Sequence, residues 1–345
     1  MAEHDDLAFA VDDYLTRSYA GDRRRKLLDS GGWDAGLAAE LAELGWYSLA
    51  VSEGRGGIGA SPADLGRVFL EYGRHLVVGP LLENSLLPAL LEGLDPDPAG
   101  TPPALVDPGV TDDWDLGSVA LNGAQLTGTV DAVRFAAQAG VLVVVAGEAV
   151  CLVAPAAPGV RIESVDSADP GTAFARVSFD GATARTVLAD GDLVGRIRAW
   201  ARLLLACELS GLAQGALERT VEYVGQREQF GRPIGGFQAV KHLAADMSAR
   251  ATGLHNLCLA ALADADDAPR AQLDLLASTA KAHAADVALR VCEDAIQLHG
   301  GMGFTTETDV SWYYRRALAL RAWYGDETEL RHRIGAALLD PGRQT

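Results

Sequence analysis

The chain has 345 residues, of which 49% are hydrophobic and 22% charged, as is ordinary for a globular protein with a large core. Its net charge of −18 argues against binding to a nucleic acid backbone, although a few well-placed arginines would suffice for a phosphorylated cofactor. There is no signal peptide pattern, and no uncharged hydrophobic run approaches the roughly 20 residues that span a bilayer. We therefore expect a cytoplasmic protein, and the scattered cysteines and histidines predict no metal site.

The first part of the chain is predicted to be helical. The stretch "WDAGLAAELAELGWYSLAV" has hydrophobic residues at three- and four-residue spacings, and Gly45 within it is a suitable helix end. Ser61 can cap a further helix that has Pro62 at its first position. The segment "DPDPAGTPP" then interrupts the helical pattern. We predict an N-terminal helical domain over residues 1–102.

The hydrophobic period changes in the middle of the chain and changes back later. The runs "GSVALNGAQLTGTVDAVRFA" and "AGVLVVVAGEAVCLVAP" alternate or are wholly apolar between glycine and proline breaks, which predicts an antiparallel sheet or small barrel over residues 103–192. Long helical patterns such as "LDLLASTAKAHAADVALRVCEDAIQLHG" follow, so residues 193–345 are predicted to form a helical bundle domain.

Three collinear stretches carry a resemblance to a known family. They are "ELGWYSLAVSEGRGGIG" (43–59), "REQFGRPIGGFQAVKHLAADM" (227–247) and "QLHGGMGF" (297–304). Together they resemble the acyl-CoA dehydrogenase family over nearly the whole chain. The resemblance implies an α+β fold with an N-terminal helical domain, a central β-barrel and a C-terminal four-helix bundle. It also implies an FAD-dependent oxidoreductase of lipid metabolism that forms the α,β double bond of an acyl-CoA substrate.

In this family, the bundle of one subunit holds the adenine and diphosphate end of the FAD of a neighbouring subunit. A forked guanidinium suits a diphosphate, and glycines allow the backbone to approach a nucleotide closely. The positions of this chain that match the family's cofactor-binding pattern are Arg227, Phe230, Gln238, Gln297, Gly300 and Gly301.

The residues alone leave a second interpretation of these positions open. Arg227 could be a surface ion-pair partner of Glu222 or Glu228, and Gly300 with Gly301 could simply end a helix.

The family's catalytic glutamate has no counterpart in this chain. Counting from the glycine turn places Tyr324 where the family has the base, and the family's other base position maps to Ala201. A tyrosine titrates near 10, so Tyr324 is a poor base at neutral pH, and the neighbouring acids Asp326 and Glu327 are expected to raise its pKa further. Asp326 and Glu327 are themselves weak candidates for a displaced carboxylate base.

The flavin-ring side of the pattern is also altered. The family's Thr-Glu-Pro segment is at best Val106-Asp107-Pro108, while Ala132 and Arg134 replace the aromatic residue and the threonine that would contact the ring. The resemblance therefore implies a non-catalytic subunit of a heteromeric, steroid-degradation type of acyl-CoA dehydrogenase, in which a second family member supplies the base in a heterotetramer. The alternatives are a homo-oligomeric dehydrogenase with a displaced base, a flavin-free acyl-CoA-binding or scaffold protein, and a different flavin reaction such as that of a monooxygenase.

Overall fold

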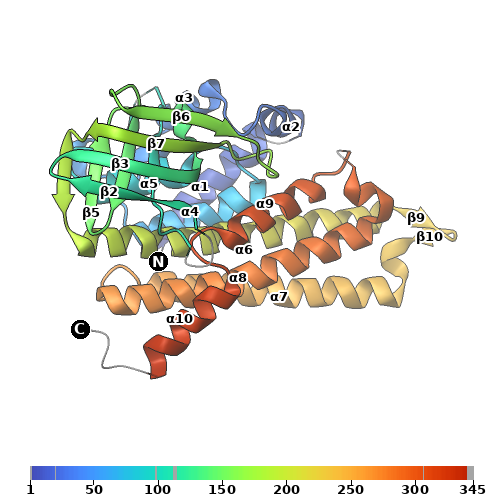
Figure 1. The fold of residues 1–345 in the computed structure, drawn as a ribbon. Coiled ribbons are helices and arrows are strands. Elements are labelled where there is room, and N and C mark those ends of the chain that lie inside the picture. The colour runs from blue at the N-terminus through green and yellow to red at the C-terminus, as the bar shows by residue number, and fades with distance from the viewer. Residues whose placement is uncertain (1, 20, 98, 112–114, 306, 340–345) are drawn as a thin grey trace.

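The computed structural model describes residues 2–19, 21–97, 99–111, 115–305 and 307–339. The N-terminal part is helical, as predicted (Figure 1). Its helices are α1 (Ala2–Ser18), α2 (Asp22–Asp29), α3 (Ala35–Glu43), α4 (Pro62–His75) and α5 (Leu81–Leu90). The predicted cap of α4 is confirmed, because the Ser61 hydroxyl accepts a hydrogen bond from the Asp64 amide while the Asp64 carboxylate accepts one from the Ser61 amide.

The central part consists of two four-stranded sheets that share one hydrophobic core. The first sheet has the order β1-β4-β5-β8 and contains β1 (Pro103–Val106), β4 (Val141–Ala146), β5 (Ala149–Val153) and β8 (Thr186–Ala189). The second has the order β2-β3-β7-β6 and contains β2 (Gly117–Asn122), β3 (Gln125–Arg134), β6 (Val160–Val165) and β7 (Phe174–Thr183). The predicted antiparallel pairing holds except for β1, which pairs with β4 in parallel.

The C-terminal part is built around one helix that runs the length of the molecule (Figure 1). Its helices are α6 (Gly191–Gln226), α7 (Gln238–Ala263), α8 (Arg270–His299), α9 (Val310–Ala322) and α10 (Glu327–Leu339). A small hairpin of β9 (Glu228–Gln229) and β10 (Arg232–Pro233) projects between α6 and α7 at one end of the bundle. None of the described helices combines the length and hydrophobicity needed to cross a membrane.

Helices α4 and α6 approach each other backbone to backbone. A Cβ atom added to Gly73 would lie 1.9 Å from the carbonyl oxygen of Glu208, and one added to Gly211 would lie 1.9 Å from the carbonyl oxygen of Leu70. No side chain fits at that separation, so the crossing requires glycine at both positions.

This contact gives a stability prediction with a control in the same helix. Gly211→Ala should lower the free energy of unfolding by about 1–3 kcal/mol, because the new methyl group forces α4 and α6 apart. Gly225→Ala in α6, where an added Cβ meets nothing within 4 Å, should be neutral or stabilise by up to about 1 kcal/mol. Urea unfolding of both variants measures the difference, and equal stabilities would show that the crossing is not tightly packed.

Candidate functional site

The β9–β10 hairpin carries the most exposed aromatic side chain of the candidate cofactor surface. Phe230 is 91% exposed at the hairpin turn, in a left-handed conformation with φ of 53°. Its ring meets that of Phe237 edge to face at 6.1 Å, and the Arg232 guanidinium lies over Phe237 at 4.1 Å. Arg227 ends α6 directly before the hairpin, and its carbonyl oxygen accepts a hydrogen bond from the Ile234 amide that closes the hairpin base.

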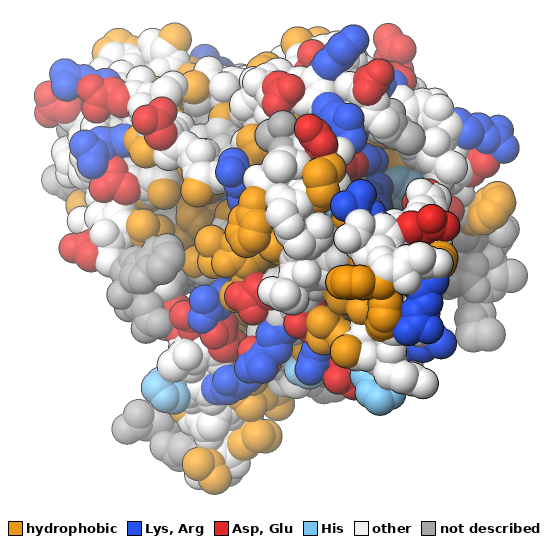
Figure 2. All heavy atoms as spheres, turned by 90° about the vertical axis from the view of Figure 1, so that its right-hand side faces the viewer, with side chains coloured by type: hydrophobic (Ala, Val, Ile, Leu, Met, Phe, Trp, Pro, Cys, Tyr) orange, Lys and Arg blue, Asp and Glu red, His pale blue; other side chains and the backbone are white. Residues whose placement is uncertain are grey.

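A hydrophobic cavity of about 410 Å³ lies beside this hairpin. Its lining residues are Gln229, Phe230, Ile234, Phe237, Ala239, Val240, Leu243, Gln297 and Leu298. The structure thus brings together Phe230 and Gln297, which are 67 positions apart in the sequence. Figure 2 faces this end of the molecule and shows hydrophobic side chains gathered on its surface. The other four predicted residues do not line the cavity: Arg227 and Gln238 directly adjoin the hairpin or a lining residue, and Gly300 and Gly301 follow the lining residue Leu298 by two and three positions.

The electrostatics of this surface favour an anion. Helix α7 begins at Gln238 with no side-chain cap and no acid in its first turn, so its first backbone N–H groups and the positive end of its dipole remain available. Arg227 is exposed, and the described residues include no ion-pair partner for its side chain. Glu222, one of the partners that the sequence left open, instead accepts a hydrogen bond from Gln226.

The two glycines after α8 differ in what this chain requires of them. Gly300 is the C-cap of α8 and has φ of 60°, so the interpretation of this glycine as a helix end is correct for its backbone. A Cβ on Gly301 would meet nothing within 4 Å, and Gly301 has no left-handed φ. Among the described residues, neither close packing nor backbone conformation requires glycine at position 301.

The flavin-ring side of the family pattern contains a buried ion pair. Arg134, at the end of β3, lies with its Nε atom 3.3 Å from Oε1 of Glu83 on α5, and both residues are less than 5% exposed. Nε and Nη1 of Arg134 and Oε2 of Glu83 have no hydrogen-bond partner among the described residues. Burial raises the pKa of Glu83, and the Arg134 charge acts against that shift. Ala132, with φ of 54°, presents no ring at the position where the family has an aromatic residue.

Asp107, which replaces the family's glutamate before proline, anchors the long helix. Its carboxylate accepts hydrogen bonds from Nε and Nη2 of Arg198 on α6 at 2.8 and 2.7 Å. The carboxylate is therefore engaged within the chain.

The segment at Tyr324, where the sequence predicts the position of the family's catalytic glutamate, is held by the buried side chains of Arg202 and Lys281. The Tyr324 carbonyl oxygen accepts a hydrogen bond from Nε of Arg202 on α6 at 3.0 Å. Nζ of Lys281 on α8 donates to the carbonyl oxygens of Arg321 at 2.9 Å and Gly325 at 3.0 Å. The Tyr324 side chain is buried, and the neighbouring Trp323 ring packs against Phe174 of β7 at 5.6 Å.

Tyr324 is unsuited to proton abstraction. Burial raises its pKa well above the usual value, and the charges of Asp107 and Glu83 add to the shift. The acids that contribute most to this pKa are Asp107, directly after β1, and Glu83 on α5, and not the sequence neighbours Asp326 and Glu327.

The weak carboxylate candidates are engaged in local structure. Oδ1 of Asp326 accepts hydrogen bonds from the amides of Thr328 and Glu329 at the start of α10. Glu327 pairs with Arg321, whose hydrogen bonds lower the pKa of that carboxyl.

The sequence reasoning missed four buried carboxylates among the described residues, which are Glu83, Asp169, Glu208 and Glu329. Glu83 is buried beside Arg134, and Glu329 accepts a hydrogen bond from the Thr111 hydroxyl at 2.7 Å. A single acid inside the apolar run "LLENSLLPALL" was a usable signal for Glu83. Ala201, the family's other base position, is fully buried and carries no ionisable group.

Comparison with known proteins identifies the family. The C-terminal domain model of acyl-CoA dehydrogenases matches residues 195–339. Acyl-CoA dehydrogenase IpdE2 of Mycobacterium tuberculosis is 32% identical over 307 residues, which cover 85% of this chain and 84% of IpdE2. The chain belongs to the acyl-CoA dehydrogenase family.

The chain is also similar to a longer relative and to chains of solved structures. Acyl-CoA dehydrogenase FadE34 of M. tuberculosis is 32% identical over 306 residues, but the match covers only 41% of FadE34. A chain of the ChsE4–ChsE5 complex from M. tuberculosis superposes with a TM-score of 0.87 at 26% identity, covering 98% of this chain and 97% of that one. A chain of a variant of the Tcur3481–Tcur3483 steroid ACAD superposes with a TM-score of 0.85 at 26% identity, with 99% of each chain covered. These matches confirm the predicted α+β fold.

Acyl-CoA dehydrogenases typically bind FAD, and the two halves of the site differ in how well they suit it. The surface around Arg227 fits the nucleotide end, since it combines an unpaired arginine, an uncapped helix start, an exposed aromatic ring and a glycine with open space beside it. The region of Ala132 and Arg134 does not fit the flavin ring, because Ala132 offers no ring at the position matched to the family's aromatic residue and the buried Arg134, paired with Glu83, stands at the position matched to its threonine.

The grip of Lys281 gives a pH prediction. Burial lowers its pKa from 10.5 to about 7, so between these pH values the folded chain binds fewer protons than the unfolded chain and stability rises with pH. Lys281→Met removes this contribution. As the pH rises from 7 to 10, the free energy of unfolding of the wild type should therefore increase relative to that of the variant, by at most about 1.4 kcal/mol per pH unit.

Urea unfolding at several pH values measures this difference, and Lys26→Met, which changes an exposed lysine, is the control. A constant difference between wild type and Lys281→Met across this pH range would contradict the prediction.

Proposed function

We propose that this chain is the non-catalytic subunit of a heteromeric acyl-CoA dehydrogenase and that it completes the FAD site of a catalytic partner. One asymmetry carries the proposal. The six residues that match the nucleotide-binding pattern are all exposed, whereas the ring side of the same chain is closed by the Glu83–Arg134 pair and lacks a free carboxylate at position 324. A surface that is complete for one half of a cofactor suits a site that is shared between two chains.

The residues of the hairpin surface have different roles in that shared site. Arg227 would bind the diphosphate through its guanidinium, supported by the N–H groups at the start of α7. Phe230 and Gln297 would contact the nucleotide end at the 410 Å³ cavity. When bound, FAD supplies the hydride acceptor for oxidation of the acyl-CoA. The partner would supply the base that removes the α-proton and the pocket for the acyl group.

The substrate class follows from the relatives. The Tcur3481–Tcur3483 protein is a steroid ACAD, and ChsE4 forms a complex with ChsE5. We propose by analogy that this chain acts with a second acyl-CoA dehydrogenase family subunit on the acyl-CoA of a steroid side chain. The analogy supports the two-chain assembly and the substrate class together.

The flavin content of the purified protein tests the shared site. The chain alone should be colourless. Together with a family member that retains the Tyr-Glu-Gly run, it should form a yellow complex with half as many flavins as chains. A yellow homo-oligomer of this chain that oxidises an acyl-CoA would overturn the proposal in favour of the homomeric dehydrogenase.

In that complex, Arg227→Gln should weaken FAD binding about 10- to 100-fold, because a charge-assisted hydrogen bond to phosphate is lost. Arg250→Gln is the matched control, since Arg250 pairs with Asp294 on α8 away from the hairpin. Flavin release on dilution, followed by fluorescence, measures both variants.

The rival base residues give a separate prediction. Tyr324→Phe, Asp326→Asn and Glu327→Gln should each leave kcat of the complex within about threefold of wild type, because none of them abstracts the proton in the proposed assembly. A displaced base in this chain would instead show a loss of about 10²–10⁴-fold in one variant. Stopped-flow reduction of the flavin by substrate distinguishes the two results.

A further inference from the structure

A second, polar cavity of about 680 Å³ lies between α2, α6 and the segment that leads into α9. Its lining residues are Arg24, Arg25, Glu218, Arg219, Glu222, Tyr223, Gln226, His299, Glu307, Thr308, Asp309 and Val310. The end of α8 separates it from the hydrophobic cavity, since Gln297 and Leu298 line that cavity and His299 lines this one. Neither Arg227 nor Phe230 contributes to the polar cavity.

Three arginines surround one carboxylate in this cavity. Arg24 contacts Oδ2 of Asp309, while Nε of Arg25 lies 3.4 Å from Oδ1 and Nε of Arg219 lies 3.8 Å from Oδ2. At Asp309 itself three guanidinium groups face one carboxylate, while Glu218, Glu222 and Glu307 line other parts of the cavity. The Asp309 side chain is only 9% exposed, so solvent screens these charges weakly.

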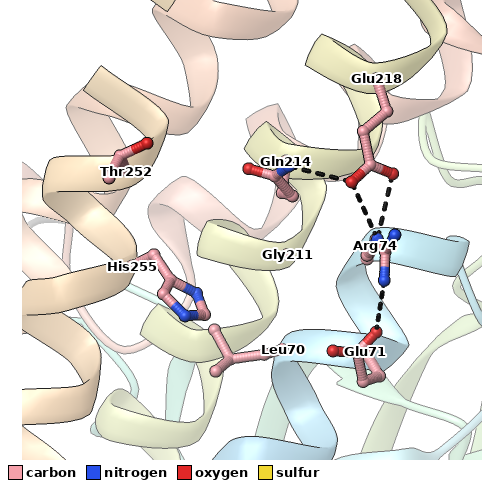
Figure 3. Close-up of a pocket in the computed structure, with 8 residues that line it drawn as sticks. All are labelled: Leu70, Glu71, Arg74, Gly211, Gln214, Glu218, Thr252 and His255. Carbon is pink, nitrogen blue, oxygen red and sulfur yellow. Dashed lines mark hydrogen bonds and ion pairs between the residues drawn. The ribbon is translucent and has the colours of Figure 1, made fainter. Parts of the chain in front are cut away.

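The glutamates of the cavity wall are held elsewhere. Figure 3 shows Glu218 turned toward Arg74, whose Nε lies 3.1 and 3.0 Å from its two carboxylate oxygens, and Gln214 donates to the same group. Glu222 accepts from the Gln226 amide at 3.2 Å. Glu307 is exposed and meets Arg25 through its backbone carbonyl oxygen. Among the described residues, the carboxylates of the three glutamates therefore form no ion pair with Arg24, Arg25 or Arg219.

The buried Arg24 guanidinium lacks a hydrogen-bond acceptor for one of its N–H groups among the described residues. It is 5% exposed, and its Nε atom is buried without a hydrogen-bond partner. A buried guanidinium N–H without an acceptor is destabilising, and native proteins normally satisfy such a group with protein, water or ligand. An acceptor-rich anion in the cavity would provide the partner.

The cavity is also rigid around the arginines. The Tyr223 and His299 rings stack at 4.2 Å, and Nδ1 of His299 donates to the Ala295 carbonyl oxygen at 2.8 Å. The Arg219 guanidinium lies over the Tyr313 ring at 4.9 Å and donates to the Gly215 carbonyl oxygen. Donors fixed in this way lose little freedom when a ligand binds.

We propose that this cavity binds a small phosphate-bearing molecule through Arg24, Arg25 and Arg219. The oxygens of a phosphate can accept hydrogen bonds from guanidinium groups that approach from both α2 and α6, among them the unpartnered Nε of Arg24. One carboxylate offers only two oxygens to three guanidinium groups, which leaves donors without acceptors. The inference concerns this chain alone and does not rest on the proposed function.

The test uses inorganic phosphate and pyrophosphate as probes on the full chain without a partner. Both should raise the unfolding temperature above the effect of sodium chloride at equal ionic strength, and calorimetry on Arg227→Gln, which removes the proposed diphosphate-binding arginine of the hairpin, should still show one site. The Arg25→Gln/Arg219→Gln double variant should bind at least about 10-fold more weakly. These two arginines are partly exposed, and each single variant gives the same readout if the double variant fails to fold.

Two further variants decide which surface the probes occupy. Arg227→Gln should lose any binding of the probes at the hairpin but keep the binding that the Arg25→Gln/Arg219→Gln variant lacks, and the control Arg250→Gln should bind phosphate like wild type. Loss of all binding in Arg227→Gln would place the probes at the hairpin surface and overturn the inference. Equal binding by the double variant and wild type would overturn it too, as would an effect no larger than that of sodium chloride.

Discussion

The burial of α6 on all sides is the constraint on which the rest of the structure depends. This helix packs against helices of both the N-terminal and C-terminal parts and against the first sheet. Its charged side chains therefore hold the neighbouring segments in place. Arg198 fixes Asp107 after β1, and Arg202 fixes the segment at Tyr324. Glu208 shares the buried Arg316 with Asp169 from the loop after β6. Buried charges of this kind are tolerated only when paired, so each pair fixes the position of its partner segment.

Local patterns were sufficient for most of the fold, because helix and hairpin periods depend on neighbouring residues. The Ser61 cap and the strands of β2–β3 and β4–β5 follow directly from their sequences. The parallel pairing of β1 with β4 could not be predicted in the same way, since no turn connects those strands. The candidate cofactor residues at the hairpin were predicted from the family pattern, and composition alone would not have distinguished them from surface ion pairs.

The missed features all depend on residues far apart in the chain. Glu83 and Arg134 are 51 positions apart, and each looks unremarkable until α5 is placed against the end of β3. The same is true of Tyr324, whose ring is affected by Asp107 and Glu83 more than by the acids beside it. Position 324 could be recognised as lacking a glutamate from sequence, but the reason that tyrosine is stable there is visible only in three dimensions.

The exposure of Phe230 has a consequence for the life of the chain in the cell. Because the Phe230 ring is 91% exposed on a tight hairpin, its burial contributes little to the stability of the fold. The ring can contact an apolar surface of another protein. If a second subunit covers this ring, a free copy of the chain is a short-lived species that is exposed to chaperones and proteases until it assembles. In that case the cell has to make the two polypeptides in equal amounts, because the exposed Phe230 ring disfavours the unassembled chain.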